Sequence, residues 1–221
     1  MEVKEFIGKV HIAYKGKGAH KAPVKDTDKY KLYLSVANDM LRNWSEDPKY
    51  NWDSLYEFYE DTFTGNSIEA PTGFCKLIEP AELENGNLKL ELKPTKVRYR
   101  KRDKNAYYVY GHSPRTIDFT FGETLTDYVG GSLSFAFGTY APKLVNETDP
   151  VICDSLQWLI YATAAELARN DPAKDDQFEP LLQLASVEYT KMTDTAKVVI
   201  MGQENSIQRK STAFNIGGGM R

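Results

Sequence analysis

The spacing of apolar residues changes twice along this chain, and this change restricts the fold more than any other feature of the sequence. Between residues 28 and 44 apolar residues recur every three or four positions, which is typical of an amphipathic helix. Between residues 52 and 145 apolar and polar residues alternate, and after residue 149 the helical spacing returns. This order favours an α+β fold in which a β lobe is inserted into a helical bundle.

The first helical segment has an apolar stripe and defined ends. Asp26 or Thr27 is the expected N-cap, because either side chain can accept a hydrogen bond from a backbone N–H of the first turn. Pro48 lacks an amide hydrogen, so the helix is expected to end before it. The stripe consists of Tyr33, Val36, Ala37, Met40, Leu41 and Trp44.

A helical hairpin is predicted near the end of the chain. Asp149 with Pro150, and Asp171 with Pro172, both have the pattern of an N-cap followed by proline in the first helical turn. An apolar stripe follows each pair, and the short connection between the two helices favours an antiparallel arrangement. We expect this hairpin and the first helix to form the core of the bundle.

The middle of the chain has the pattern of several short strands. One strand is expected around Leu88, Leu90 and Leu92, after an Asn-Gly turn signal. Further candidates are KVRYR, NAYYVYG, RTIDFTF and SLSFAFG, which are separated by Gly, Pro, Asn and Asp. This pattern predicts an antiparallel sandwich or a partly closed barrel.

Extended arms are expected at both ends of the chain. Near the N-terminus a strand candidate with Val10, Ile12 and Tyr14 leads into a Gly- and Lys-rich loop. The C-terminus ends in STAFNIGGGMR, and glycines lose more backbone entropy on ordering than other residues, so this end needs contacts from outside the subunit to become ordered. The predicted division is an N-terminal arm (1–27), a helical bundle (28–48 and 146–197), a β lobe (49–145) and a C-terminal arm (198–221).

The composition of the chain restricts the functional classes to which the protein can belong. The chain has 221 residues, 41% of them hydrophobic, with a formal net charge of −3, which indicates a globular protein rather than a dedicated nucleic-acid binder. The longest near-continuous apolar run, residues 158–165, is too short to span a membrane, so a soluble protein is expected. Cys75 and Cys153 are far apart and have no partners at metal-ligand spacing, which predicts a reducing compartment without disulfides.

The sequence shows no convincing catalytic set. His11, His20 and His112 are dispersed, and no nucleophile elbow or metal-binding motif is present. A first-turn Cys153 could have a lowered pKa, but a small buried residue is the favoured interpretation. The acidic stretches KDDQFE and YEFYED are interpreted as solvated faces. We therefore expect a protein that is not an enzyme and that has no metal or other cofactor.

One strongly basic stretch, KPTKVRYRKRDK at residues 93–104, remains to be explained. Three interpretations are open: a solvated hairpin, a protein interface that requires the charge, or a nucleic-acid site in which Tyr99, Tyr107 and Tyr108 stack on bases. Because no recognition motif accompanies the charge, we expect contact with a neighbouring subunit or a tail component. The residues assigned to this interface are Arg98, Arg100, Lys101, Arg102 and Lys104.

The sequence resembles a known family over roughly residues 28–197. The order YYVYG, RTIDFTF, GGSLSFAFGTYAPKLVNETDP and then DSLQWLIYATAAELARNDPAKDDQFEPLLQLASVEYTKM resembles the head-to-tail adaptor proteins of tailed, in particular short-tailed, bacteriophages. These are also called connector or gatekeeper proteins. LSVANDMLRNW and NWDSLYEF look like the first helix of that family and the start of its β lobe.

The resemblance implies a structural virion protein that is assembled in the host cytoplasm. Such proteins form a ring, usually a dodecamer, beneath the portal protein; genomic DNA passes through the ring without sequence-specific binding, and a tail tube or nozzle protein attaches below. No membrane partner is implied. Alternatives from other classes are a nucleic-acid-binding module that uses residues 93–104, and an unrecognised hydrolase.

In that family the C-terminal arm reaches into the portal ring, so residues 205–221 are expected to bind the portal. Phe214 and Ile216 share one face of an extended segment and would serve as anchors. The residues assigned to portal binding are Phe214, Asn215, Ile216, Gly217, Gly218, Gly219, Met220 and Arg221.

Overall fold

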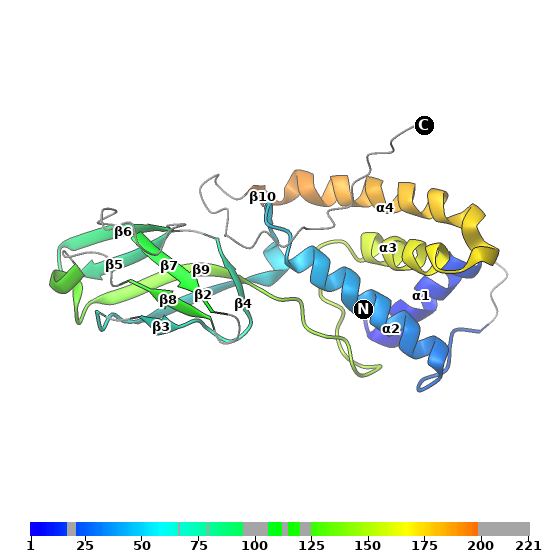
Figure 1. Cartoon of the computed structure of the whole chain (residues 1–221), viewed down its shortest axis with the longest axis horizontal. Coiled ribbons are helices and arrows are strands. Elements are labelled where there is room, and N and C mark those ends of the chain that lie inside the picture. Colours follow the sequence, from blue (N-terminus) through cyan, green and yellow to red (C-terminus); the bar gives the residue numbers. More distant parts are fainter. Residues whose placement is uncertain are drawn as a thin grey trace.

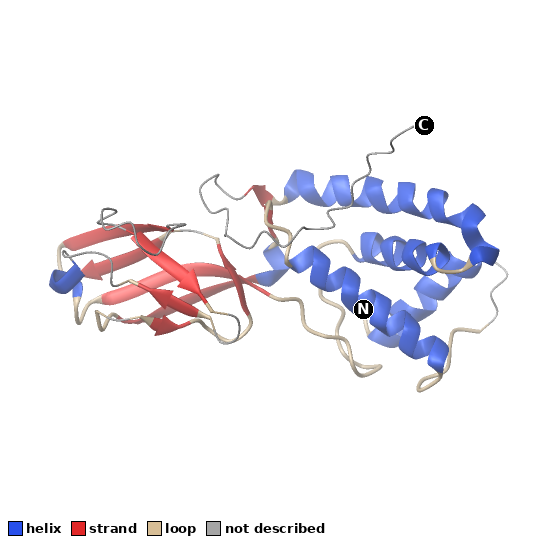
Figure 2. Cartoon of the chain, viewed as in Figure 1, coloured by secondary structure: helices blue, strands red, loops and turns tan. Residues whose placement is uncertain are grey.

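A computed structural model describes residues 1–16, 21–65, 67–78, 80–94, 106–111, 115–119 and 125–198. Within them, helices and strands are segregated into a helical lobe and a β lobe that lie end to end (Figures 1 and 2). The predicted α+β class is confirmed. Each lobe has its own cluster of buried apolar side chains.

The helical lobe is arranged around one central helix. It consists of α1 (Val3–Lys15), α2 (Asp28–Ser45), α3 (Leu156–Arg169) and α4 (Asp175–Thr195). α3 contacts each of the other three, and α4 runs antiparallel to it (Figure 1). Helix α3 can approach its neighbours closely because the side chains on its buried surface are small; these include Ala162, Ala164, Ala165 and Ala168.

The predicted first helix is confirmed. It spans Asp28–Ser45, and the side-chain oxygen of Thr27 accepts a hydrogen bond from the backbone N–H of Tyr30 at 3.3 Å. Thr27 rather than Asp26 is therefore the cap. The whole predicted stripe, from Tyr33 to Trp44, is buried in the helical lobe.

The expectation of an N-terminal arm with a short strand is wrong for residues 3–15, which form α1. Val3, Phe6 and Val10 are completely buried against the other helices. These residues recur every three or four positions, so the sequence does carry the helical signal. The strand interpretation relied on Ile12, whose side chain is 51% exposed on the opposite face of α1.

The predicted start of the hairpin is also wrong by several residues. Ser155, not Asp149, caps α3, and its hydroxyl oxygen accepts from the backbone N–H of Trp158 at 3.1 Å. The carboxylate of Asp149 instead accepts from the backbone N–H groups of Val145 and Asn146, at 2.9 and 2.6 Å, and so closes a loop. An acidic residue before a proline is compatible both with a helix cap and with a contact that closes a loop.

The second predicted cap is correct in part. The carboxylate of Asp171 accepts from the backbone N–H of Ala173 at 3.1 Å and caps a short 3-10 turn, Pro172–Lys174. α4 begins directly after this turn. Leu181, Ala185 and Met192 on its predicted stripe are buried.

The β lobe is one curled, mainly antiparallel sheet. Its eight strands follow the order β2-β9-β5-β6-β7-β8-β3, with β4 also paired to β9. Whether the lobe is best described as a sandwich or a barrel stays a prediction. The strands are β2 (Tyr56–Thr62), β3 (Ile68–Glu69), β4 (Phe74–Leu77), β5 (Ala81–Asn85), β6 (Leu88–Pro94), β7 (Ala106–Tyr110), β8 (Thr116–Asp118) and β9 (Ser132–Thr139).

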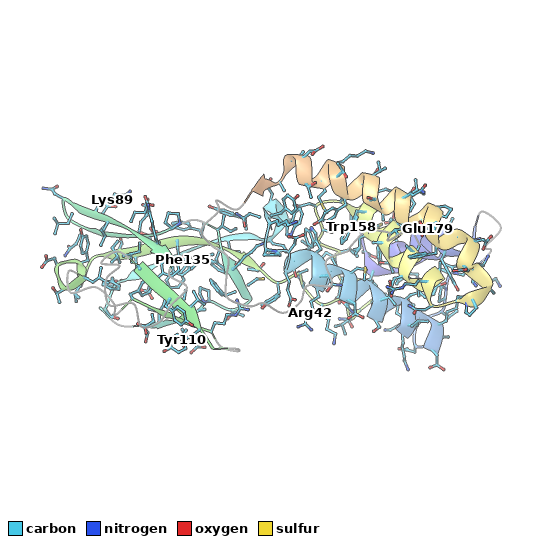
Figure 3. All side chains as sticks on the ribbon, turned by 45° about the horizontal axis from the view of Figure 1, so that its top comes forward. Arg42, Lys89, Tyr110, Phe135, Trp158 and Glu179 are labelled. Atoms are coloured by element: carbon cyan, nitrogen blue, oxygen red, sulfur yellow. The ribbon has the colours of Figure 1, made fainter. Side chains whose placement is uncertain are left out.

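Strand β9 organises the sheet. One edge pairs with β2 over the register Tyr56↔Gly138 to Thr62↔Ser132, and the other edge is shared by β5 and β4. Alternate residues of β9 point into the core, which Figure 3 shows for Phe135. The predicted strand around Leu90 is confirmed as β6, joined to β5 by a tight turn in which Gly86 has a φ of 60°.

Candidate functional site

Both sets of predicted site residues lie outside the described part of the chain. The portal-binding residues, 214–221, follow the last described residue, Val198. The basic residues 98–104 lie in the gap between Pro94 and Ala106. The structure does describe the residues on both sides of the basic segment and the residues that lead toward the C-terminal one.

The C-terminal segment leaves the described structure between the two lobes. Beyond α4, strand β10 (Lys197–Val198) pairs antiparallel with β1 (Tyr50–Asn51) in a separate two-stranded sheet (Figure 1). The register is Tyr50↔Val198 and Asn51↔Lys197. The last described residues are therefore fixed beside the segment that connects α2 to the β lobe.

Aromatic side chains fill the helical side of this junction. The ring of Trp52 lies 5.4 Å from that of Trp44 and 5.3 Å from that of Tyr50, measured between centroids. The indole N–H of Trp52 donates to the backbone carbonyl of Trp44 at 2.7 Å. Tyr189 from α4 packs against both Trp52 and Trp158, with centroid distances of 6.2 and 5.8 Å. The junction thus ties α2, α3 and α4 to the first residues that lead into the β lobe.

A buried lysine joins the β lobe to this junction. The ammonium group of Lys76, on β4, donates to the backbone carbonyls of Asp47 and Tyr50. Burial lowers the pKa of Lys76, because a charged amine loses hydration inside the protein. Next to it, the thiol of Cys75 donates to the backbone carbonyl of Ser45 at 3.6 Å. These contacts hold β4 against the end of α2.

Sequence reasoning did not assign a role to Lys76. The available signal was a single lysine inside the apolar run FCKLI, residues 74–78. A lysine in a buried strand must find acceptors for its N–H groups. Here the free backbone carbonyls after the end of α2 are those acceptors.

Burial disfavours the thiolate form of both cysteines. Cys153 lies before the N-cap Ser155 and not in the first turn of α3, so the helix dipole does not activate it in the way the sequence suggested. Burial raises the pKa of its thiol to about 12. Burial also raises the pKa of Cys75. The favoured interpretation of Cys153 as a small packed residue is supported.

A small cavity of about 280 Å³ lies between α1, α2 and the end of α3. The hydroxyl of Tyr14 donates to the carboxylate of Asp171, and burial together with this bond raises the pKa of Tyr14 to about 12. His11 is buried, and its Nδ1 lies 3.1 Å from the hydroxyl oxygen of Tyr33. These hydrogen bonds join α1 to α2 and to the residue that caps the turn before α4.

The basic segment lies between two strands that run parallel to each other. Strands β6 and β7, which flank it, pair in parallel, with Lys93 opposite Ala106 and Pro94 opposite Tyr107. A hairpin joins antiparallel strands, whereas parallel neighbours need a crossover connection. Residues 95–105 themselves lie outside the described residues, so the expectation of a basic hairpin stays a prediction.

The aromatic residues beside this segment differ in exposure. Tyr107 is buried in the core of the β lobe and cannot stack on a base, contrary to one of the open interpretations. Tyr108 and Tyr110 are half-buried and stack on each other, with centroids 6.0 Å apart. This pair is the aromatic surface that β7 presents directly after the basic segment.

Strand β2 forms an exposed acidic edge. Within the described residues it pairs only with β9, so it ends the hydrogen-bonded order of the sheet. Glu57, Glu60 and Asp61 are exposed, and Phe58 is 61% exposed. The predicted solvated face at YEFYED is thus exposed, but it also presents a large apolar ring and a strand edge.

Helix α4 carries an apolar stripe on its outer face. Leu184 and Val187 are 46% and 53% exposed, and Pro180 is exposed one turn earlier. These three residues lie along one line of the helix, separate from the line of the buried Leu181 and Ala185. Apolar side chains that are aligned on a surface often mark a contact with another protein.

The described residues contain no group of three or more His, Cys, Asp or Glu side chains arranged to hold a metal ion. Among the described helices, none is both long and apolar enough to cross a membrane. The sequence matches no protein family model, and no curated protein matches it significantly.

Proposed function

We propose that the protein is a structural head-to-tail adaptor of a tailed bacteriophage, which assembles as a ring between a portal protein and a tail component. The observation that carries this proposal is the elongated two-lobed body, in which the C-terminal segment leaves from the junction between the lobes (Figure 1). An adaptor needs separate surfaces for two partners, and each lobe presents one.

The resemblance of residues 28–197 to the adaptor family supports the same role. The aligned residues Pro180, Leu184 and Val187 on α4 offer a surface for neighbouring copies in the ring. DNA passes through the ring without sequence-specific binding, which is compatible with the acidic net charge of −3. The proposed role involves no catalysis and no cofactor.

The proposed portal contact is made by residues 205–221. Removing residues 211–221 should leave a folded subunit, because both apolar cores lie within the remaining chain. The truncated protein should no longer attach to portal-bearing heads in a co-sedimentation assay. Its circular dichroism and melting temperature should match those of the full chain, and undiminished attachment would refute the portal assignment.

Ring formation is tested separately by mass photometry. The wild-type chain should form a large particle, alone or on the portal, and Leu184→Asp with Val187→Asp should reduce it to monomers that remain folded. Gln183→Asp is the matched control, because Gln183 is exposed on α4 beside the stripe. Equal particle yields for the stripe variant and its control would contradict a role for α4 in assembly.

A nucleic-acid-binding module is the second candidate. The stacked pair Tyr108 and Tyr110, beside the basic segment, is the observation that favours it. In that case the protein should bind single-stranded DNA with an affinity that falls steeply as salt increases, and Tyr108→Ala should weaken this binding. Weak, sequence-independent DNA affinity alongside a large assembled particle would favour the adaptor.

A further inference from the structure

The cavity of about 280 Å³ in the helical lobe has an apolar lining. It lies at the end of this lobe that points away from the β lobe, where the last turn of α1, the first half of α2 and the end of α3 meet (Figure 1). Of its aliphatic side chains, Val36 and Leu167 are buried, whereas Leu32 is 55% exposed, so the cavity reaches the surface of the protein. Because a cavity of roughly 150 Å³ can already hold benzene, this one has room for a short alkyl chain or an aromatic ring.

Two tyrosine rings form one wall of this cavity. The rings of Tyr14 and Tyr33 meet edge to face, with centroids 5.9 Å apart. The hydroxyl of Tyr14 donates to the carboxylate of Asp171, and the hydroxyl oxygen of Tyr33 lies 3.1 Å from Nδ1 of His11. Since both hydroxyl groups have partners inside the protein, the two rings are held in place before any ligand enters. A wall of this kind lowers the ordering cost of binding.

The charged groups on the lining leave one positive charge without a partner. The carboxylate of Asp171 accepts from the hydroxyl of Tyr14, which lowers the pKa of Asp171, so this group is charged at neutral pH. It also lies 3.7 Å from the ammonium nitrogen of Lys15. The second lysine of the lining, Lys29, places its ammonium nitrogen 5.9 Å from the centroid of the Tyr33 ring and forms no ion pair within the described residues. Two ammonium groups thus face one carboxylate that is already bonded.

The same two lysines also act on a side chain in the interior. Burial lowers the pKa of His11, and the charges of Lys29 and Lys15 lower it further. His11 lies within hydrogen-bond distance of Tyr33, whose ring belongs to the cavity wall. The positive potential of the lysines therefore extends from the cavity into the lobe, and such a potential favours an anion.

We propose that this cavity binds a small monoanion with an apolar body, of the class of aliphatic or aromatic carboxylates, taken up free from solution. Its carboxylate would accept hydrogen bonds from the ammonium groups of Lys15 and Lys29. Its apolar body would lie against Val36 and Leu167 and would cover the exposed side of Leu32. One net positive charge on the lining matches one negative charge on the ligand. The inference uses residues of the helical lobe alone and does not depend on the adaptor role.

Titration of the full chain with sodium octanoate tests the ligand class. Calorimetry should show saturable binding with one site per chain. Octan-1-ol, which has the same number of carbon atoms and no charge, should bind at least about tenfold more weakly, because it cannot form a charge-assisted hydrogen bond. Absence of saturable octanoate binding, or equal affinities for the two probes, would overturn the inference.

A pair of lysine variants separates the cavity from the general charge of the protein. Lys29→Met removes the ammonium group and keeps an unbranched apolar stem, so octanoate affinity should fall about tenfold while octan-1-ol affinity should not change. Lys31→Met is the matched control, since Lys31 is exposed on the same helix and does not line the cavity. This control should bind octanoate as the wild type does. Equal losses for the two variants would contradict a specific site.

A third variant and a photoreactive probe test the location. Leu32→Asp places a carboxylate at the opening of the cavity and should weaken octanoate binding at least about tenfold, whereas the fold should persist because Leu32 is exposed. Circular dichroism checks the fold of this variant. A diazirine derivative of octanoate, mapped by mass spectrometry, should label peptides that contain Val36 or Leu167, and excess octanoate should prevent this labelling. Labelling confined to the β lobe would overturn the site.

Discussion

The helical lobe and the β lobe are assembled from the chain in different ways. The β lobe uses one continuous stretch, from Tyr56 to Thr139, whereas the helical lobe joins residues from both sides of that stretch. Asn38 and Leu144, which are 106 positions apart, exchange two hydrogen bonds of 3.1 and 2.8 Å. Closing the helical lobe therefore brings together residues from both sides of the β lobe.

The pairing of β2 with β9 brings the two ends of the β lobe together. β2 carries the chain into the β lobe and β9 carries it out, and Tyr56 lies opposite Gly138. Folding of the β lobe thus places both ends of the inserted segment side by side and lowers the entropic cost of closing the helical lobe. We therefore expect a destabilising substitution in the β lobe to have a more local effect than one in the helical lobe.

The largest effect is expected from a charge in the core of the helical lobe. Leu159 on α3 is completely buried, so Leu159→Asp would place an unpaired carboxylate at the contact of several helices. Soluble folded protein should be lost, as measured by yield and circular dichroism. Leu181→Asp, also in this core, should have the same result. A well-folded Leu159→Asp protein would contradict the core assignment, and Leu184→Asp is the exposed control.

A cavity in the β lobe should have a smaller and more local effect. Phe135→Ala removes a ring that is 2% exposed and should destabilise the lobe by about 3–5 kcal/mol. The far-UV helical signal should persist at temperatures where the signals of tyrosines in the β lobe already report unfolding. A single coincident transition would show that the two lobes unfold as one unit.

Removing the observed cap of α3 should cost about 1 kcal/mol. Ser155→Ala deletes the side-chain acceptor of the Trp158 N–H, and Ser155→Asp should restore most of the lost stability because aspartate also caps helices. Urea denaturation monitored by circular dichroism measures the stability of both variants. Equal stability of Ser155→Ala and the wild type would contradict a stabilising role for this cap.

The smallest effect is expected from a change of pH, which should alter the stability of the helical lobe. Burial, with Lys29 and Lys15 nearby, lowers the pKa of His11. Below about pH 6.5 the unfolded chain binds a proton that the folded protein resists, so stability should fall as the pH decreases through this range, by at most about 1.4 kcal/mol per pH unit. His11→Gln should flatten the dependence between pH 7 and 5. Parallel curves of stability against pH for the variant and the wild type would exclude this role for His11.

The sequence was sufficient for elements whose signal is local. α2 with a cap at Asp26 or Thr27, and β6 after its turn, follow from residue spacing and capping chemistry alone. The start of α3 was missed because Asp149 before Pro150 fits a loop as well as a cap. The parallel pairing of β6 with β7 was missed because pairing depends on contacts that no single segment encodes.

The candidate surfaces were predictable to different degrees. Exposure of YEFYED could be inferred from its charge, whereas its position at the end of the sheet depends on β9, which comes some 70 residues later in the chain. The contact of Lys76 with the end of α2 likewise depends on how the lobes meet. Local composition indicates which side chains need partners but not which distant segment supplies them.

The pairing of β10 with β1 determines how the molecule would respond to tension on its C-terminus. A pull transmitted through the chain beyond Val198 first acts on the contact with Tyr50 and Asn51, and only after that contact opens does it reach the last turn of α4. β1 lies between the helical lobe and the β lobe, where Trp52 and Lys76 anchor the chain on either side. Tension on the C-terminus would therefore load the junction between the two lobes before it loaded α4.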